Sequence, residues 1–117
     1  MLVIENKRIQ PVNFEWVDGK KKVELQLTQM SVSDRLKLSD MHTSIIENKE
    51  LEEAEQRSHF LTSRIMCSVK DLKGNHFFTD SVEKVNELLT GDVLFQLSAE
   101  VTKLNPINTD SIDDAKK

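Results

Sequence analysis

The longest uninterrupted hydrophobic pattern in the chain covers residues 50–73 and is typical of an amphipathic helix. Neither Gly nor Pro interrupts this stretch, and Gly74 follows it. At ~1.5 Å per residue, the predicted helix is about 36 Å long. Its apolar and small side chains recur at spacings of three and four, at Leu51, Ala54, Ser58, Leu61, Ile65, Ser68 and Leu72, with Val69 widening the stripe.

Two apolar residues of this predicted helix lie off the main stripe. Phe60 and Cys67 are one heptad apart and project from nearly the opposite side. A helix with apolar residues on two sides needs two neighbours: one is the rest of the chain, and the other is either the rest of the chain or a partner. Aromatic residues are favoured at interface centres. We therefore name a candidate partner-binding surface of Phe60, Cys67, Arg64 and Trp16, with core filling as the competing interpretation.

The N-terminal part of the chain has the alternation of a β-hairpin, which we predict over residues 12–27. Asp18 and Gly19 give the turn signal, and the lysines at 20–22 are expected to widen the turn beyond two residues. Two strands alone are marginally stable, so the hairpin must rest on helices, pair with another strand, or join a sheet across subunits. The inward side chains are predicted to be Val23, Leu25 and Leu27, and the outward ones Glu24 and Gln26.

The first helix is predicted to run through Ile46, with Ser31 or Ser33 as its N-cap. Ser31 has Asp34 three residues later, which resembles a capping box. A break at residues 48–49 should separate this helix from the long one, because the apolar phase changes there. The apolar residues 1–4 are either a short edge strand or a disordered start.

The C-terminal part is predicted to contain two more helices. Residues 76–78 form either a brief strand or an extended segment that plugs the core. Asp80 should cap a helix that Gly91 ends, and Asp92 should cap a final helix that stops at Asn105 and Pro106. The remaining residues, 107–117, are polar and aperiodic, so we predict a disordered tail.

Together these patterns predict an α+β fold in a single domain, residues 1–106. An N-terminal β-hairpin packs on a bundle of about four helices, one of them long. At 117 residues and 38% hydrophobic content, the chain is long enough for one core.

Charge and composition narrow the classes of function. The net charge of -4 argues against nucleic-acid binding, which needs a basic face. No stretch approaches the ~20 apolar residues of a membrane span, and the N-terminus lacks the apolar region of a signal peptide. A lone cysteine, Cys67, cannot form an internal disulfide. We expect a cytoplasmic protein that does not bind membranes.

Candidate chemistry is sparse. The histidines His42, His59 and His76 lack the spacing of a helical zinc site, and the three glycines do not form a phosphate loop. Acidic residues between positions 47 and 55 fit a solvated helix start without a metal. We therefore expect no enzymatic activity, no cofactor and no metal.

Three segments of the chain match a known pattern in order: LTQMSVSDR after the hairpin, then IMCSVKDLKGNHFF, then VEKVNELLTGDVLFQLSAEVTKLNP. Within them Val69, Asp71 and Gly74 form a V-x-D-x-x-G turn, and an Asn-Pro stop follows at residues 105–106. Over residues 12–106 the chain resembles the small tail assembly chaperones of long-tailed (siphovirus-type) bacteriophages.

The resemblance implies a chaperone without catalysis. Such a protein binds the tape measure protein, keeps it soluble and promotes assembly of tail tube subunits around it. It acts in the host cytoplasm and is not expected in the mature virion. The resemblance also implies self-association, and a longer product made by frameshifting. The alternative is a small structural or adaptor protein, from a phage tail or a bacterium, that stays in a stable complex.

Overall fold

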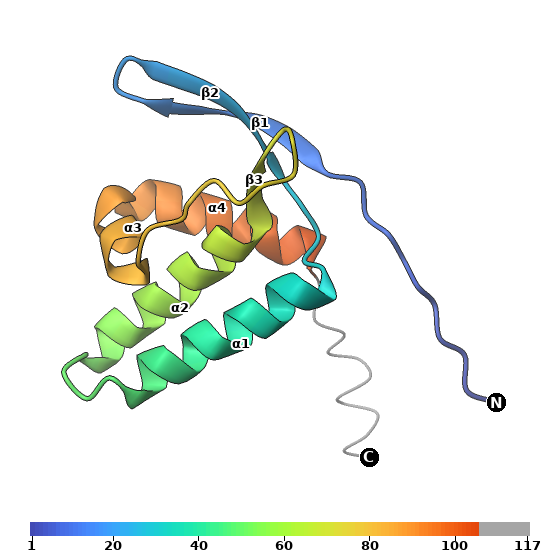
Figure 1. Cartoon of the computed structure of the whole chain (residues 1–117), viewed down its shortest axis with the longest axis horizontal. Helices are drawn as coiled ribbons and strands as arrows, with labels where there is room; N and C mark the ends of the chain where they lie inside the picture. Colours follow the sequence, from blue (N-terminus) through green and yellow to red (C-terminus); the bar gives the residue numbers. More distant parts are fainter. Residues whose placement is uncertain (106–117) are drawn as a thin grey trace.

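The computed structural model of the chain describes residues 1–105 and confirms the predicted α+β architecture. The predicted tail lies outside the described residues. A three-stranded sheet carries the N-terminal hairpin at one end of a helical body (Figure 1). The elements in order are β1 (Val12–Asp18), β2 (Lys21–Leu27), α1 (Val32–Glu47), α2 (Glu53–Ser68), β3 (Val69–Asp71), α3 (Val82–Leu88) and α4 (Gly91–Leu104).

The hairpin closes more tightly than its sequence predicts. Asp18 pairs directly with Lys21, so the turn has two residues and the next lysines belong to β2. Gly19 has φ +62, the left-handed conformation that short hairpin turns require. The alternation within β2 is confirmed: Leu25 and Leu27 are buried, while Glu24 is exposed.

The third strand comes from the same chain. β3 pairs antiparallel with β2, from Leu27 opposite Val69 to Leu25 opposite Asp71. The hairpin is therefore supported by another strand of the same chain. The sheet order β1-β2-β3 leaves β1 at a free edge.

The long helix predicted over residues 50–73 is shorter, because α2 ends at Ser68. Val69 is fully buried and is the first residue of β3. Its apolar side chain therefore packs in the core as part of a strand and not as part of a helix. The backbone exchanges helical bonds for the ladder with β2, and this tertiary pairing overrides the local helical pattern.

α2 is the central helix of the body, with α1 along one side and α3 and α4 on the other (Figure 1). Both neighbours that its two apolar sides require therefore belong to this chain. The packed centre combines the sheet with α2 and α4, and Leu25, Ile65 and Val101 are each 0% exposed.

Two predicted helix caps are displaced by one or two residues. Ser81 caps α3 in place of Asp80, and Thr90 caps α4 in place of Asp92. Each hydroxyl residue immediately precedes the first helical residue, where a short side chain reaches the amide of the third helical residue. Gly91 therefore begins α4 and does not end α3.

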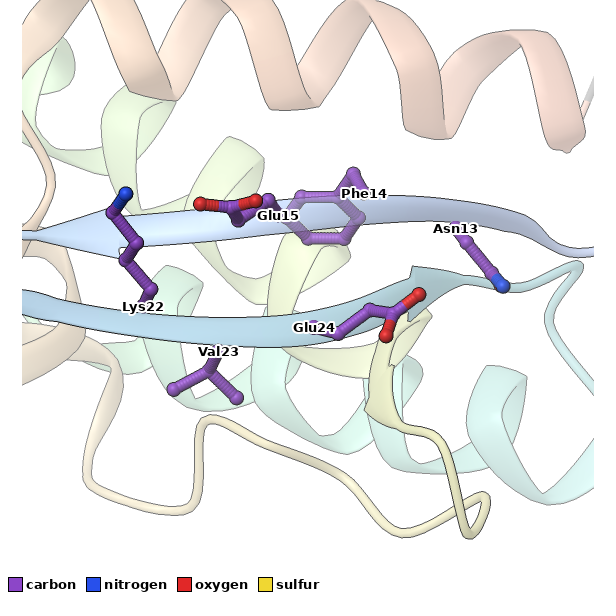
Figure 2. A pocket seen from close by; sticks show the side chains of 6 residues that line it. All are labelled: Asn13, Phe14, Glu15, Lys22, Val23 and Glu24. Atoms are coloured by element: carbon purple, nitrogen blue, oxygen red, sulfur yellow. The ribbon is translucent and has the colours of Figure 1, made fainter.

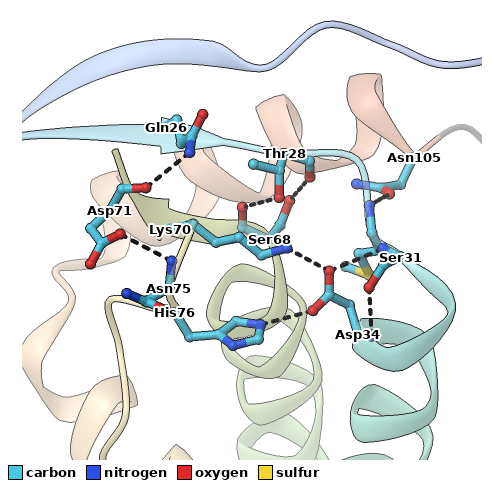
Figure 3. Close-up of polar contacts among 11 residues, drawn as sticks. Gln26, Thr28, Ser31, Asp34, Ser68, Lys70, Asp71, Asn75, His76 and Asn105 are labelled. Carbon is cyan, nitrogen blue, oxygen red and sulfur yellow. Dashed lines mark hydrogen bonds and ion pairs between the residues drawn. The ribbon is translucent and has the colours of Figure 1, made fainter. Parts of the chain in front are cut away.

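A buried carboxylate joins α1 to the segment around β3 (Figure 3). Asp34 completes the predicted capping box with Ser31, which is the N-cap of α1. The same carboxylate accepts from Lys70 Nζ at 2.8 Å and lies 2.9 Å from His76 Nε2. Its side chain is 4% exposed.

Two further polar contacts close the fold beside this carboxylate (Figure 3). The Thr28 amide donates to the Ser68 carbonyl at 2.9 Å, which ties the end of β2 to the end of α2. The buried side chain of Asn105 accepts from the Met30 amide at 2.7 Å. The end of α4 is thereby fixed to the start of α1.

Candidate functional site

The predicted surface residue on the hairpin, Trp16, packs into an aromatic cluster. Its ring meets Phe78 edge-on, with centroids 5.5 Å apart, and Phe77 meets Phe78 at 5.0 Å. Phe78 is 4% exposed and plugs the core, while His76 forms a single β-bridge with Lys70 of β3, so each predicted alternative holds for part of residues 76–78. Trp16 and Phe77 stay partly exposed and border a shallow pocket of about 320 Å³ between the hairpin and α3.

The predicted surface residues on α2 face α1. Phe60 is half-buried, and its ring lies edge-on to His42 of α1 at a centroid distance of 4.8 Å. Arg64, one turn further along, is also only partly exposed. The side of α2 that we assigned to a partner is therefore largely occupied by α1.

Cys67 is 0% exposed, and its Sγ lies 3.7 Å from Met41 Sδ of α1. Burial raises the pKa of the Cys67 thiol from 9.0 to about 11. A residue with no exposed atoms cannot contribute to a docking surface, so the structure removes Cys67 from the predicted one. The four predicted residues do not converge, because Trp16 belongs to the hairpin cluster and Phe60 to the helix pair. Partner binding by Trp16, Phe60 and Arg64 stays a prediction.

The structure brings forward a different surface, the solvent face of α1. Val32, Leu36 and Ile46 on this helix are 77%, 65% and 64% exposed. At 100° per residue they lie within an arc of about 80°, opposite the buried Ile45. Ser39 and Thr43 fall in the same arc, so none of its members is charged. We call this set the α1 outer stripe: Val32, Leu36, Ser39, Thr43 and Ile46.

Sequence reasoning missed this stripe although a signal was present. Leu36 and Ile46 do not share the phase of Leu38, Met41 and Ile45, which pack inward. Two apolar phases on one helix indicate two apolar faces.

The outer face of the hairpin is polar and carries an unfavourable pair. A shallow hollow of about 430 Å³ lies over β1 and β2. Figure 2 shows the residues that line it, with Glu15 and Glu24 on neighbouring strands. These two residues are direct cross-strand partners, an arrangement that is destabilising for like charges. Among the residues that the structure describes, neither carboxylate forms a salt bridge.

Within residues 1–105, no three His, Cys, Asp or Glu side chains gather as they would around a metal ion. None of the helices described there has the length and apolar character to span a bilayer.

No protein-family model matches the chain, and no curated protein sequence matches it. Among solved structures, that of the bacteriophage HK97 tail assembly chaperone is similar, with a TM-score of 0.47 and 16% sequence identity. The match covers 80% of this chain and 85% of that chain.

Proposed function

We propose that the chain is a tail assembly chaperone of a long-tailed bacteriophage. It binds the tape measure protein in the host cytoplasm, keeps it soluble, promotes assembly of the tail tube and leaves before the virion is complete. It performs no catalysis. The sequence resemblance over residues 12–106 supports this choice of client. The α1 outer stripe is the surface that we propose binds it.

The residues that carry the resemblance build a turn. The Asp71 carboxylate accepts from the Lys73 amide at 2.9 Å and from the Asn75 amide at 3.0 Å. Gly74 has φ +91, which favours glycine. This turn brings the chain back from β3 so that Phe78 can enter the core. Asp71 and Gly74 of the motif therefore support the fold.

The α1 outer stripe is the observation that carries the proposal. It runs along a helix of 16 residues, about 24 Å, and exposes three large apolar side chains without a charge among its members. An amphipathic helix of a client can bury its apolar face on such a surface. Charged residues beside the stripe, Arg35, Asp40 and Glu47, are placed to select the register of a client.

The test is a pull-down of the tagged chain from cells that produce phage tails, with eluates identified by mass. The wild-type chain should recover a long, largely helical protein. Leu36→Asp should recover at least tenfold less, because a charge would be buried at the contact. The matched control is Leu72→Asp, since Leu72 is 53% exposed and lies outside α1.

The outcomes separate the competing functions. If purified particles contain the chain, it is a structural or adaptor subunit and not a chaperone. If the wild-type chain recovers only itself or an unrelated host protein, the proposed client is wrong. Equal losses with Leu36→Asp and Leu72→Asp would remove the stripe as the binding surface while leaving the chaperone role in place.

A further inference from the structure

Two adjoining hollows lie at the end of the helical body that is far from the sheet. α2 leads directly into β3, so its first turn, and the turn that joins it to α1, lie at this far end (Figure 1). One hollow of about 400 Å³ lies between this turn, α1 and α3, and the other, of about 390 Å³, between the turn, α2 and α3. Asn48, Leu51, His59 and Glu83 line both hollows.

The two hollows differ in chemistry. The first, which we call the apolar compartment, is lined by hydrophobic side chains from three segments. They are Met41 and Ile45 of α1, Leu51 of the connecting turn and Val82 of α3. The second, which we call the acidic compartment, is lined by carboxylates and by no lysine or arginine. Its carboxylates belong to Glu50, Glu55, Glu83 and Glu87.

The carboxylates of the acidic compartment are held together at an electrostatic cost. Glu83 and Glu87 are one turn apart on α3, where like charges destabilise a helix. The helix dipole favours Glu55 in the first turn of α2 but opposes Glu87 in the last turn of α3. Among the residues that the structure describes, none of the four acidic side chains forms a salt bridge. A cation in the compartment would remove this cost.

The wall that the two compartments share contains a buried side chain without a partner. His59 is 7% exposed. The hydroxyls that follow it on α2 are paired, since Thr62 donates to Asn86 Oδ1 and Ser63 to the Phe60 carbonyl, each at 2.8 Å. Within residues 1–105 the His59 ring has no hydrogen-bond partner, although it lines both compartments. Because a buried polar group without a partner is costly, this ring indicates a site for a polar ligand.

The spacing of the acidic groups selects the kind of cation. In the described part of the chain, no three of these side chains are close enough to coordinate one metal ion. Carboxylates spread around a hollow of about 390 Å³ suit a larger, organic cation. Lysine and arginine side chains combine such a charged head with an apolar stem.

We propose that the two compartments together bind a lysine or arginine side chain of a helical partner, along with an apolar side chain one turn away. The charged head enters the acidic compartment and donates to the carboxylates and to the His59 ring. The apolar side chain enters the apolar compartment. Side chains one turn apart on a helix are neighbours, as the two compartments are.

This inference rests on the proposed function for its partner, because a client with amphipathic helices presents apolar and charged residues one turn apart. The site itself is separate from the α1 outer stripe. Met41 and Ile45 lie on the side of α1 that faces away from the stripe. A client that uses both surfaces makes an apolar contact at one and a charged contact at the other.

The first experiment uses a synthetic alanine-rich helical peptide of about 15 residues that carries one leucine and one lysine one turn apart. It is titrated into the ¹⁵N-labelled full-length chain and followed by NMR. Binding should saturate with a dissociation constant of about 1 mM or below, with shifts concentrated in residues 48–59 and 82–87. Glutamine in place of the lysine should weaken binding about tenfold, because it removes the cation.

The second experiment changes the acidic compartment. The double variant Glu83→Gln with Glu87→Gln should bind the lysine peptide about tenfold more weakly than the wild type. The matched control is Glu15→Gln with Glu24→Gln, which changes the net charge by the same amount on the hairpin. It should stay within about twofold of the wild type, because salt screens distant charges. Circular dichroism confirms that each variant is folded.

Three results would overturn the proposal. The first is no saturable binding of the lysine peptide up to about 5 mM. The second is equal affinity for the lysine and glutamine peptides, or shifts outside the two compartments. The third is an equal loss in the two double variants, which would reveal general attraction to an acidic protein. The peptide replaces the client in these measurements, so a chain that recovers a long helical protein but binds no peptide loses this site and keeps the proposed function.

Discussion

At the scale of single residues, Asp34 shows how one carboxylate serves several segments. Burial by itself would raise the pKa of Asp34, but hydrogen bonds from Lys70 and Ser31 outweigh it and hold the pKa below 3.8. The Asp34 carboxylate is therefore ionised in the folded protein. It connects the first turn of α1 with Lys70 of β3 and with His76.

We expect Asp34→Asn to lower the free energy of unfolding by about 2 to 3 kcal/mol, since it leaves the Lys70 ammonium, 14% exposed, without its counter-charge. Urea unfolding near neutral pH measures this loss. Asp40→Asn, an exposed change on the same helix, should stay within about 0.5 kcal/mol of the wild type. Equal effects of the two changes would contradict the role of the buried carboxylate.

Acid should remove the contribution of Asp34. Because its folded pKa is lowered, the stability from the ionised form is fully present above the unfolded value of 3.8. It is lost as the pH falls through the folded pKa. The difference in unfolding free energy between wild type and Asp34→Asn should therefore narrow as the pH falls below 3.8. A difference that widens over this window would speak against the assignment.

The buried thiol gives a second prediction at this scale. With 0% exposure and a pKa of about 11, Cys67 should react with a thiol reagent only as the protein unfolds. Labelling followed by mass spectrometry should track the unfolding curve in urea. Rapid labelling of the folded protein would return Cys67 to the surface and reopen the original partner-binding hypothesis.

At the scale of elements, the turn after β3 and the start of α4 each contain a glycine, but only one needs it. Gly74 has φ +91, so Gly74→Ala forces a conformation that side chains resist, and should destabilise by about 1 to 2 kcal/mol. Gly91 begins a helix with open space around it, so Gly91→Ala should be neutral or stabilise by about 0.5 to 1 kcal/mol. Thermal unfolding of both variants tests the contrast, and a similar loss in each would reject it.

The limits of sequence reasoning are also clearest in the elements. The hairpin phase was predictable because Leu25 and Leu27 alternate with polar residues. The end of α2 was not, because Val69 suits either a helix face or a strand. The choice depends on pairing with Leu27, 42 positions earlier in the chain, and no local pattern reports such a partner. The displaced caps arose from neighbouring residues with nearly equal capping ability.

The candidate surface was harder to predict than the fold. The sequence indicates two apolar faces on α2, but only the structure shows that α1 covers the second face. The contact between the rings of Phe60 and His42 is part of this packing. That same packing turns the other face of α1 to solvent, with Leu36 65% exposed. A hydrophobic pattern reveals that a face needs a neighbour, whereas the arrangement of helices decides which face stays open.

At the scale of the whole molecule, the α1 outer stripe lies apart from the packed centre. The opposite side of α1 packs on α2, so the stripe can change without loss of core contacts. We expect Leu36→Asp to stay within about 0.5 kcal/mol of the wild type in free energy of unfolding, measured in urea, because Leu36 is 65% exposed. A larger loss would assign Leu36 to the packing of the fold and not to a binding surface.

The hydrogen bond from the Met30 amide to Asn105 spans 75 positions of the chain. During synthesis at ~5–20 residues per second, Asn105 is made about 4 to 15 s after Met30. Over that interval the hairpin exists without α4, which supplies Leu97, Val101 and Leu104 to the core. The nascent chain therefore stays accessible to cellular chaperones and proteases until its last helix has been made.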